Sequence, residues 1–252
     1  MIDLHSHILP GLDDGARTID ESRDMARVAS SEGVTAITAT PHVRGDFPTT
    51  AEQMERAVDE LNKDFAQERI DVAVLHGGEI DLEWLNTMAE DEIDRFSLAQ
   101  TGRYLLVEVP LIGWPLYLDS WVFELRSANI TPLLAHPERN REVQRDPGRL
   151  DAATRAGALV QVTAASLDGR LGRRVKQACE RLLELELVHV LATDAHAPAV
   201  RQGGLSNAAA ILRDEGLARY LTEEVPAAII SGEMIPTRST SRRRRRRPFG
   251  AV

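Results

Sequence analysis

The first seven residues, Met1-Ile2-Asp3-Leu4-His5-Ser6-His7, form a short apolar run that ends in two histidines. Side chains of an extended segment alternate between its two faces, so His5 and His7 share one face and can chelate one cation. A single His-x-His pair is a weak signal for a metal site. It becomes informative here because other apolar runs of the chain also end in ligand-forming residues.

Six further runs of strand length follow the first, separated by stretches of helical periodicity. The predicted strands are residues 2–5, 36–40, 72–76, 104–109, 131–135, 158–163 and 187–193. Thr18 with Glu21, and Thr50 with Gln53, are typical of capping boxes that open helices running to about Glu32 and about residue 68. This alternation predicts an α/β fold with a mostly parallel sheet. Seven units favour a closed or nearly closed barrel over an open doubly wound sheet, which stays an alternative.

The length of 252 residues fits one large domain. We expect residues 1–236 to form the barrel. Residues 237–252 are mostly Thr, Ser and Arg, which predicts a disordered Arg-rich tail. The formal net charge is −9, and arginines 242–247 supply six positive charges, so the rest of the chain carries −15. Such an acidic body argues against broad nucleic-acid binding.

The cysteine content and the hydropathy limit the kinds of metal site and the cellular location that the sequence allows. Cys179 is the only cysteine, which excludes an intramolecular disulfide and a thiolate zinc cluster. Any metal must therefore have nitrogen and oxygen ligands. The longest apolar runs are too short to span a bilayer, and the N-terminus lacks the basic-then-apolar order of a signal peptide. We therefore expect a cytoplasmic protein without a membrane span.

The residues at the carboxyl ends of the predicted strands are mostly His, Asp and Glu. In a barrel of parallel strands these ends meet on one face, where such folds place their chemistry. Each residue alone could be an ordinary loop residue, but the recurrence is hard to explain in that way. The set is His5 and His7, Asp13-Asp14-Gly15, Pro41-His42, Gly77-Gly78-Glu79, Glu108, His136-Pro137-Glu138-Arg139 and Asp194-Ala195-His196.

The charges of this set suggest how many cations it binds. Asp14, Glu79, Glu108 and Asp194 supply four negative charges when ionised. Burying these carboxylates together without compensation would be very costly. Two or three divalent cations would offset them, and three would leave a formal surplus of positive charge that attracts a phosphate. Imidazole and carboxylate ligands suit manganese, iron and zinc alike.

In identity, order and spacing these motifs resemble the polymerase and histidinol phosphatase (PHP) superfamily. The opening residues 1–15 most resemble the bacterial CpsB/YwqE-type tyrosine-protein phosphatases of capsule and exopolysaccharide systems, and the resemblance extends to about Ile230. It implies a distorted (β/α)7 barrel of the PHP type with its metal site at the C-terminal ends of the strands. The implied cofactors are three divalent metal ions, usually Mn²⁺, with Fe or Zn as alternatives.

The resemblance also implies roles for particular residues. Nine positions match metal ligands, in three groups: His5, His7, Glu79 and Asp194; Glu79 as a bridge with Glu108 and His136; and Asp14, His42 and His196. Arg139 and Arg201 match positions that contact the substrate phosphate, and we treat them as the catalytic candidates.

The implied activity is hydrolysis of phosphotyrosine in a protein by a metal-activated water. The expected partner is the C-terminal tail of an autophosphorylating bacterial tyrosine kinase of capsule or exopolysaccharide synthesis. Two alternatives stay open: a histidinol-phosphate or other small phosphoester phosphatase, and a non-catalytic metal-binding scaffold. A cysteine-dependent phosphatase is disfavoured because Leu185, and not an arginine, lies six residues after Cys179. The sequence leaves the oligomeric state open.

Overall fold

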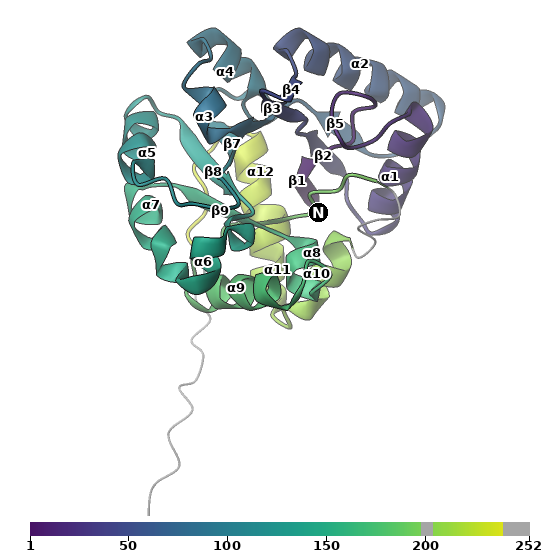
Figure 1. Ribbon diagram of the computed structural model, residues 1–252. Helices are drawn as coiled ribbons and strands as arrows, with labels where there is room; N and C mark the ends of the chain where they lie inside the picture. The colour runs from purple at the N-terminus through teal and green to yellow at the C-terminus, as the bar shows by residue number, and fades with distance from the viewer. Residues whose placement is uncertain (198–203, 239–252) are drawn as a thin grey trace, which may run out of the picture.

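The computed structural model describes residues 1–197 and 204–238 (Figure 1). Arg201 and most of the predicted tail lie outside these residues, so the predictions for them stay predictions. All seven predicted strands form, with slightly shifted ends. They are β1 (Ile2–Ser6), β2 (Ala36–Ala39), β5 (Ala73–Leu75), β7 (Tyr104–Glu108), β8 (Thr131–Ala135), β9 (Leu159–Thr163) and β10 (Val190–Ala192).

Three short strands were not predicted: β3 (His42–Arg44), β4 (Phe47–Pro48) and β6 (Glu79–Asp81). Two of them, β3 and β6, follow the second and third predicted strands after a bend, and β4 pairs with β3 as an antiparallel hairpin. The chain passes from β2 into β3 through Thr40-Pro41, and from β5 into β6 through His76-Gly77-Gly78. Glu79, which the sequence predicted just beyond a strand, therefore lies inside β6.

The strands form one sheet of order β1-β2-β5 and a second of order β10-β9-β8-β7-β6-β3-β4. Every pair is parallel except β3 with β4. The two sheets also meet beyond β10, where Asp194 N–H donates to His5 C=O at 2.8 Å and His7 N–H donates to Ala195 C=O at 2.9 Å. These bonds close the ring, which confirms the distorted barrel of seven strand units.

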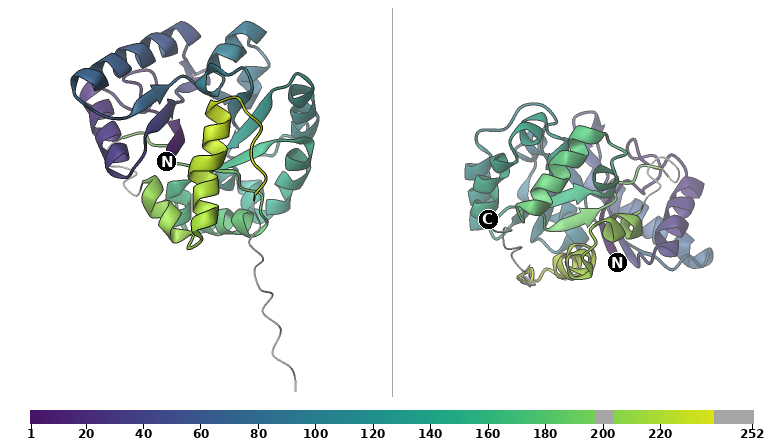
Figure 2. Two further views of the ribbon diagram at one scale, coloured as in Figure 1. Left: turned by 180° about the vertical axis from the view of Figure 1, so that it is seen from behind. Right: turned by 90° about the horizontal axis from the view of Figure 1, so that it is seen from below.

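Helices surround the strands (Figures 1 and 2). They are α1 (Ile19–Ser31), α2 (Ala51–Gln67), α3 (Leu82–Leu85), α4 (Glu90–Phe96), α5 (Leu118–Ser127), α6 (Arg141–Arg145), α7 (Asp151–Ala156), α8 (Ala164–Asp168), α9 (Arg173–Glu184), α10 (Leu205–Ile211), α11 (Glu215–Arg219) and α12 (Val225–Ile230). Seen from behind in Figure 2, α12 lies in front of the strands. Within the described residues no helix has the length and apolar character needed to cross a membrane.

Of the two predicted capping boxes, the one at α2 forms completely and the one at α1 forms only in part. At α2 both reciprocal bonds between Thr50 and Gln53 are present. At α1 the Thr18 side chain accepts from Glu21 N–H, but the Glu21 carboxylate accepts from Arg17 N–H at 2.8 Å. That prediction was therefore half right, because the Glu21 side chain binds the residue before the cap.

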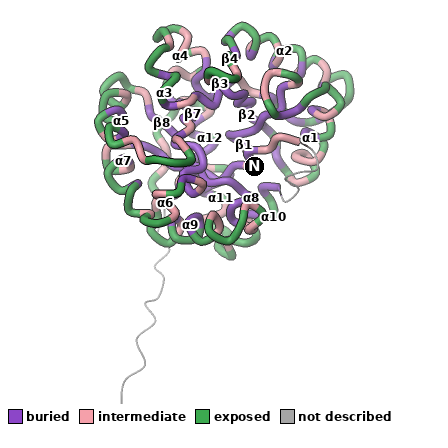
Figure 3. The backbone as a smooth tube through the Cα atoms, viewed as in Figure 1, coloured by how far each residue is buried: buried purple, intermediate pink, exposed green. Residues whose placement is uncertain are grey.

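The core lies between the helices and the strands. Met54, Val58, Leu61 and Phe65 form the predicted apolar stripe of α2, and each is at most 1% exposed. Figure 3 shows the strands buried and the outer faces of the helices exposed. This rigid ring of buried strands holds the residues at its carboxyl ends in fixed positions.

Candidate metal centre

The nine predicted metal ligands lie together at the carboxyl ends of the strands. Their donor atoms form overlapping groups in which all members lie within 4.8 Å of one another. The groups are His7, Asp14, His42 and His196; His5, Glu79 and His136; His5, His7 and Asp194; and His42, Glu79 and Glu108. Eight of the nine are largely buried, and Asp14 is the exposed one.

The two histidines of β1 form the first part of this centre. His5 Nε2 and His7 Nε2 are 3.2 Å apart, and each lies 3.4 Å from Glu79 Oε2 and 3.5 Å from Asp194 Oδ1. Tetrahedral ligands at about 2.0–2.2 Å from one ion stand about 3.3–3.6 Å from each other. The distances of the two imidazoles from each other and from the two carboxylates are therefore close to those expected of ligands to a single cation.

Glu79 lies between this group and the next one. Its Oε1 is 2.8 Å from His136 Nε2, and its Oε2 is 3.0 Å from His42 Nδ1. Glu108 approaches both histidines at 3.9 Å. The arrangement suits a bridging carboxylate. It also places His42 beside Glu79 and Glu108, a contact that the family resemblance did not imply.

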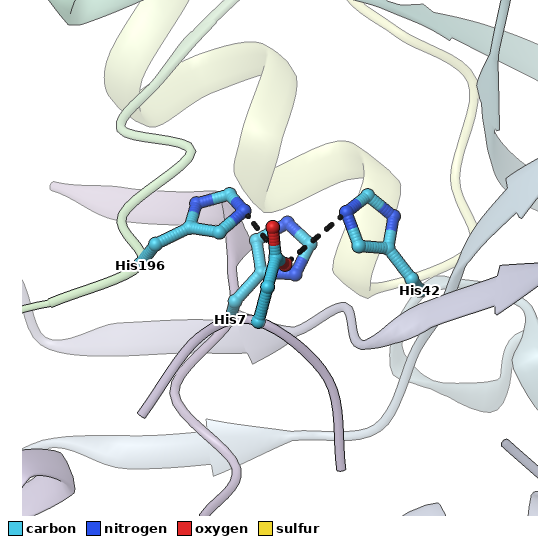
Figure 4. A group of neighbouring side chains, drawn as sticks. His7, His42 and His196 are labelled. Atoms are coloured by element: carbon cyan, nitrogen blue, oxygen red, sulfur yellow. Dashed lines mark ion pairs between the residues drawn. The ribbon is translucent and has the colours of Figure 1, made fainter. Parts of the chain in front are cut away.

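The third group surrounds Asp14. Asp14 Oδ1 lies 3.5 Å from His42 Nε2 and 3.3 Å from His196 Nε2. The His7 and His196 rings stack with centroids 3.9 Å apart. Figure 4 shows the imidazoles of His7, His42 and His196 turned toward a common point. His7 thus connects this group to the first one.

Unusual backbone conformations set the direction of two of these side chains. His136 has φ 31° and Asp194 has φ 52°, both in the left-handed region that residues other than glycine rarely adopt. Strain of this kind is retained where the surrounding structure enforces it, often at functional sites. Gly15 allows the chain to pass close to the backbone of His7, because a Cβ at position 15 would lie only 2.2 Å from the His7 carbonyl oxygen.

Asp13 supports His7 from outside the cluster. Its Oδ2 lies 2.7 Å from His7 Nδ1 and accepts from His42 N–H at 2.9 Å, while Oδ1 accepts from Gly15 N–H at 2.9 Å. A carboxylate on one ring nitrogen fixes the tautomer, so that the other nitrogen can bind a metal. The sequence analysis included Asp13 in a motif but predicted no role for it.

Gln161 has a similar supporting position. Its Oε1 lies 3.2 Å from His5 Nδ1 and accepts from His136 N–H at 3.1 Å. It is fully buried in β9. Sequence reasoning missed it, although an amide inside an otherwise apolar strand was a usable signal.

The cluster shifts the pKa values of its own members. Burial alone would lower the pKa of His7, but contacts with Asp13, Asp194 and Glu79 raise it well above the usual value. Burial alone would raise the pKa of Asp13, yet its bond to His7 lowers it to about 2. Burial and the charge of Glu79 raise the pKa of Glu108. The pKa values of these buried residues thus reflect opposing contributions from burial and from neighbouring charges.

Two arginines border the centre in the part of the chain that the structure describes. Arg139, predicted from the sequence, donates from Nη1 to Asp194 Oδ2 at 3.1 Å. Arg44, which the sequence analysis did not single out, donates from Nη1 to Glu108 Oε2 at 3.1 Å. Arg201, the other predicted phosphate contact, is outside the described residues.

Other chemically reactive residues have structural roles. Cys179 is fully buried in α9, and burial raises the pKa of its thiol well above the usual value. His189 accepts from Val160 N–H at 3.2 Å, and burial lowers its pKa to about 4. Neither residue belongs to the cluster.

The fold and the site together define an α/β barrel with a candidate polynuclear metal centre at the carboxyl ends of its strands. The model of the family described as "Capsular polysaccharide synthesis, CpsB/CapC" matches residues 1–230, and the chain belongs to this family. This finding confirms the resemblance drawn from the motifs.

The chain is also similar to individual relatives. It is 34% identical to tyrosine-protein phosphatase YwqE of Bacillus subtilis, over 99% of each chain. It is 28% identical to tyrosine-protein phosphatase CpsB of Streptococcus pneumoniae, over 78% of this chain and 83% of CpsB. A crystal structure from work on YwqE and CpsB, described there as unique metal-dependent tyrosine phosphatases, matches with a TM-score of 0.83 at 34% identity. That match covers 94% of this chain and 96% of the other.

Proposed function

We propose that this chain is a metal-dependent protein-tyrosine phosphatase, which transfers the phosphoryl group of phosphotyrosine to water without a covalent enzyme intermediate. The convergence of five imidazoles and four carboxylates at one end of the barrel carries the proposal. The names of relatives that align over nearly the whole chain support it.

The chemistry of the donor atoms fits divalent cations. Glu79 Oε2 and His42 Nδ1 are buried and only 3.0 Å apart, yet neither makes a hydrogen bond within the described residues. Leaving such groups unsatisfied is costly unless something else binds them. A divalent cation held by Glu79 and His42 would satisfy these atoms. The proposal includes three ions, one for each predicted ligand group, with Glu79 common to two of the groups; Mn²⁺ is proposed first, with Fe or Zn as alternatives.

The bound cations would supply an activated water as the nucleophile and would offset charge on the phosphoryl oxygens. Asp13 and Gln161 orient His5 and His7 for that binding. Arg139, which contacts Asp194, and Arg201 are both proposed to donate to phosphoryl oxygens. A tyrosine leaving group suits this site because a phenolate of pKa about 10 departs with little acid assistance.

The proposed substrate is a phosphotyrosine protein of capsule or exopolysaccharide synthesis, in particular the C-terminal tail of a bacterial tyrosine kinase. The family description supports the link to capsular polysaccharide. A cytoplasmic location, where such a tail would be met, is part of the same proposal.

The test compares metal-loaded and chelated protein on a phosphotyrosine peptide and on histidinol phosphate. Chelation should abolish hydrolysis, added Mn²⁺ should restore it, and the peptide should be the better substrate. Glu79→Gln should lower kcat/KM on the order of 100-fold. Cys179→Ser, the matched control, should leave it unchanged, because the thiol is buried away from the centre. Hydrolysis that survives complete chelation, or that is lost in Cys179→Ser, would contradict the proposal.

A further inference from the structure

We propose that Arg44 is a further substrate-binding residue of this centre and donates to the phosphoryl group from the Glu108 end, as Arg139 does from the Asp194 end. The inference rests on the proposed function and extends it. Neither the sequence pattern nor the family motifs pointed to Arg44, which lies at the end of β3 two residues after His42.

The contacts of Arg44 and Arg139 are closely alike. Each donates from Nη1 to a carboxylate of the cluster at 3.1 Å, Arg44 to Glu108 and Arg139 to Asp194. Each side chain is about one quarter exposed, 28% for Arg44 and 26% for Arg139. Both arginine side chains therefore border the metal ligands and are partly exposed to solvent, although Arg44 Nε is itself buried.

The β3–β4 hairpin holds Arg44 in place. Arg44 pairs with Phe47 in the antiparallel register, and its guanidinium carbon lies 5.3 Å from the centre of the Phe47 ring. The Phe47 ring in turn stacks on His42 at 5.7 Å with an interplanar angle of 20°. An arginine held by an aromatic ring loses little further freedom when a ligand binds, which favours affinity.

Arg44 keeps donors for an anion. A guanidinium carries five N–H donors in a planar fork. Within the described residues its side chain makes one hydrogen bond, to Glu108, and a second ion pair, in which Nε lies 2.9 Å from Asp46 Oδ1. Asp46 is 68% exposed, so water weakens that pair. A phosphate dianion is the stronger partner for the remaining donors.

Binding of cations to the centre would make Arg44 a stronger partner for an anion. Without cations, Glu108 and Asp46 both offset the charge of Arg44. When cations bind Glu108, its charge is shared with them, and the attraction of Arg44 for an incoming anion rises. Arg44 is thus most available for phosphate when the enzyme is loaded with metal.

The experiment measures binding of inorganic phosphate to the Mn²⁺-loaded full-length protein by calorimetry, with the metal content of each sample determined. Arg44→Met should raise the phosphate Kd, and the KM for an aryl phosphate, about tenfold, with metal content unchanged. Arg44→Lys should fall between this variant and the wild type, because a lysine keeps the charge but lacks the fork. Asp46→Asn should lower the Kd by about two- to threefold, since it removes a competing carboxylate. Arg17→Met, at an arginine with an 83% exposed side chain, is the control and should change nothing.

A different pattern in the Arg44→Met variant would contradict the proposal. If Arg44→Met loses metal in step with activity, and the reloaded variant binds phosphate like the wild type, Arg44 only positions Glu108 and the proposal is wrong. A wild-type protein that binds phosphate through Arg44 but hydrolyses no aryl phosphate would instead overturn the proposed function and leave this inference standing.

Discussion

At the scale of single residues, Asp13 controls how well His7 can act as a ligand. Its pKa of about 2 keeps it ionised at any assay pH, and its carboxylate directs the proton of His7 to Nδ1. Asp13→Asn should weaken metal binding about 10- to 100-fold, with activity recovered at high Mn²⁺. Metal titration measures the effect. Asp20→Asn, at an 80% exposed carboxylate, is the control. Equal metal affinity in Asp13→Asn and wild type would show that His7 needs no such support.

His189 gives a prediction that does not involve the metals. Burial lowers its pKa to about 4, whereas in the unfolded chain the pKa is near 6.5. The unfolded state then binds more protons between these values, so stability falls as the pH drops from about 6.5 to 4. The loss from this residue should be about 2–3 kcal/mol by pH 4.5.

His189→Gln cannot gain this proton, so its free energy of unfolding should depend less on pH over that window. Urea unfolding of both proteins at several pH values between 7 and 4.5 measures the difference. Parallel curves would mean that folding does not shift the pKa of His189.

At the scale of elements, the bend between β5 and β6 depends on two glycines. A Cβ on Gly78 would lie 2.7 Å from Cδ1 of the buried Phe96, and one on Gly77 would lie 2.7 Å from Thr38 Cγ2. Gly78→Ala should therefore cost about 1–3 kcal/mol of stability. It should also lower activity, because Glu79 follows directly. Gly216→Ala in α11 is the control, since the nearest atom there is 3.5 Å away. A Gly78→Ala protein with wild-type stability would show that Phe96 yields easily.

The sequence predicted the elements better than their pairing. All seven apolar runs became strands, because burial in a parallel sheet demands continuous apolar residues. The change of partner at Thr40-Pro41 and Gly77-Gly78 was not predicted. Local sequence shows that the chain can bend there, but the neighbour it meets afterwards is set by the whole ring.

At the scale of the whole molecule, the position of the candidate centre was predictable because parallel strands bring their carboxyl ends together. The way in which the ligand groups of the centre share residues could not be predicted. His42 beside Glu79 and Glu108, Gln161 beneath His5, and Arg44 on Glu108 all join strands that are far apart in sequence. Such contacts depend on side-chain directions that no motif specifies.

A centre that joins β1, β3, β6, β7, β8 and β10 should also stabilise the barrel in a pH-dependent way. A ligand at a hundredfold excess over its Kd contributes about 2.7 kcal/mol. Metal must displace protons from His7 and His136, whose pKa values are raised despite burial by their carboxylate contacts. Protonated histidines stabilise the metal-free protein at low pH, and this contribution is lost as pH rises through their folded pKa values. Chelation should therefore lower the Tm more at pH 8 than at pH 6, measured by calorimetry with and without Mn²⁺. An equal loss at both pH values would mean that these imidazoles do not exchange protons for metal.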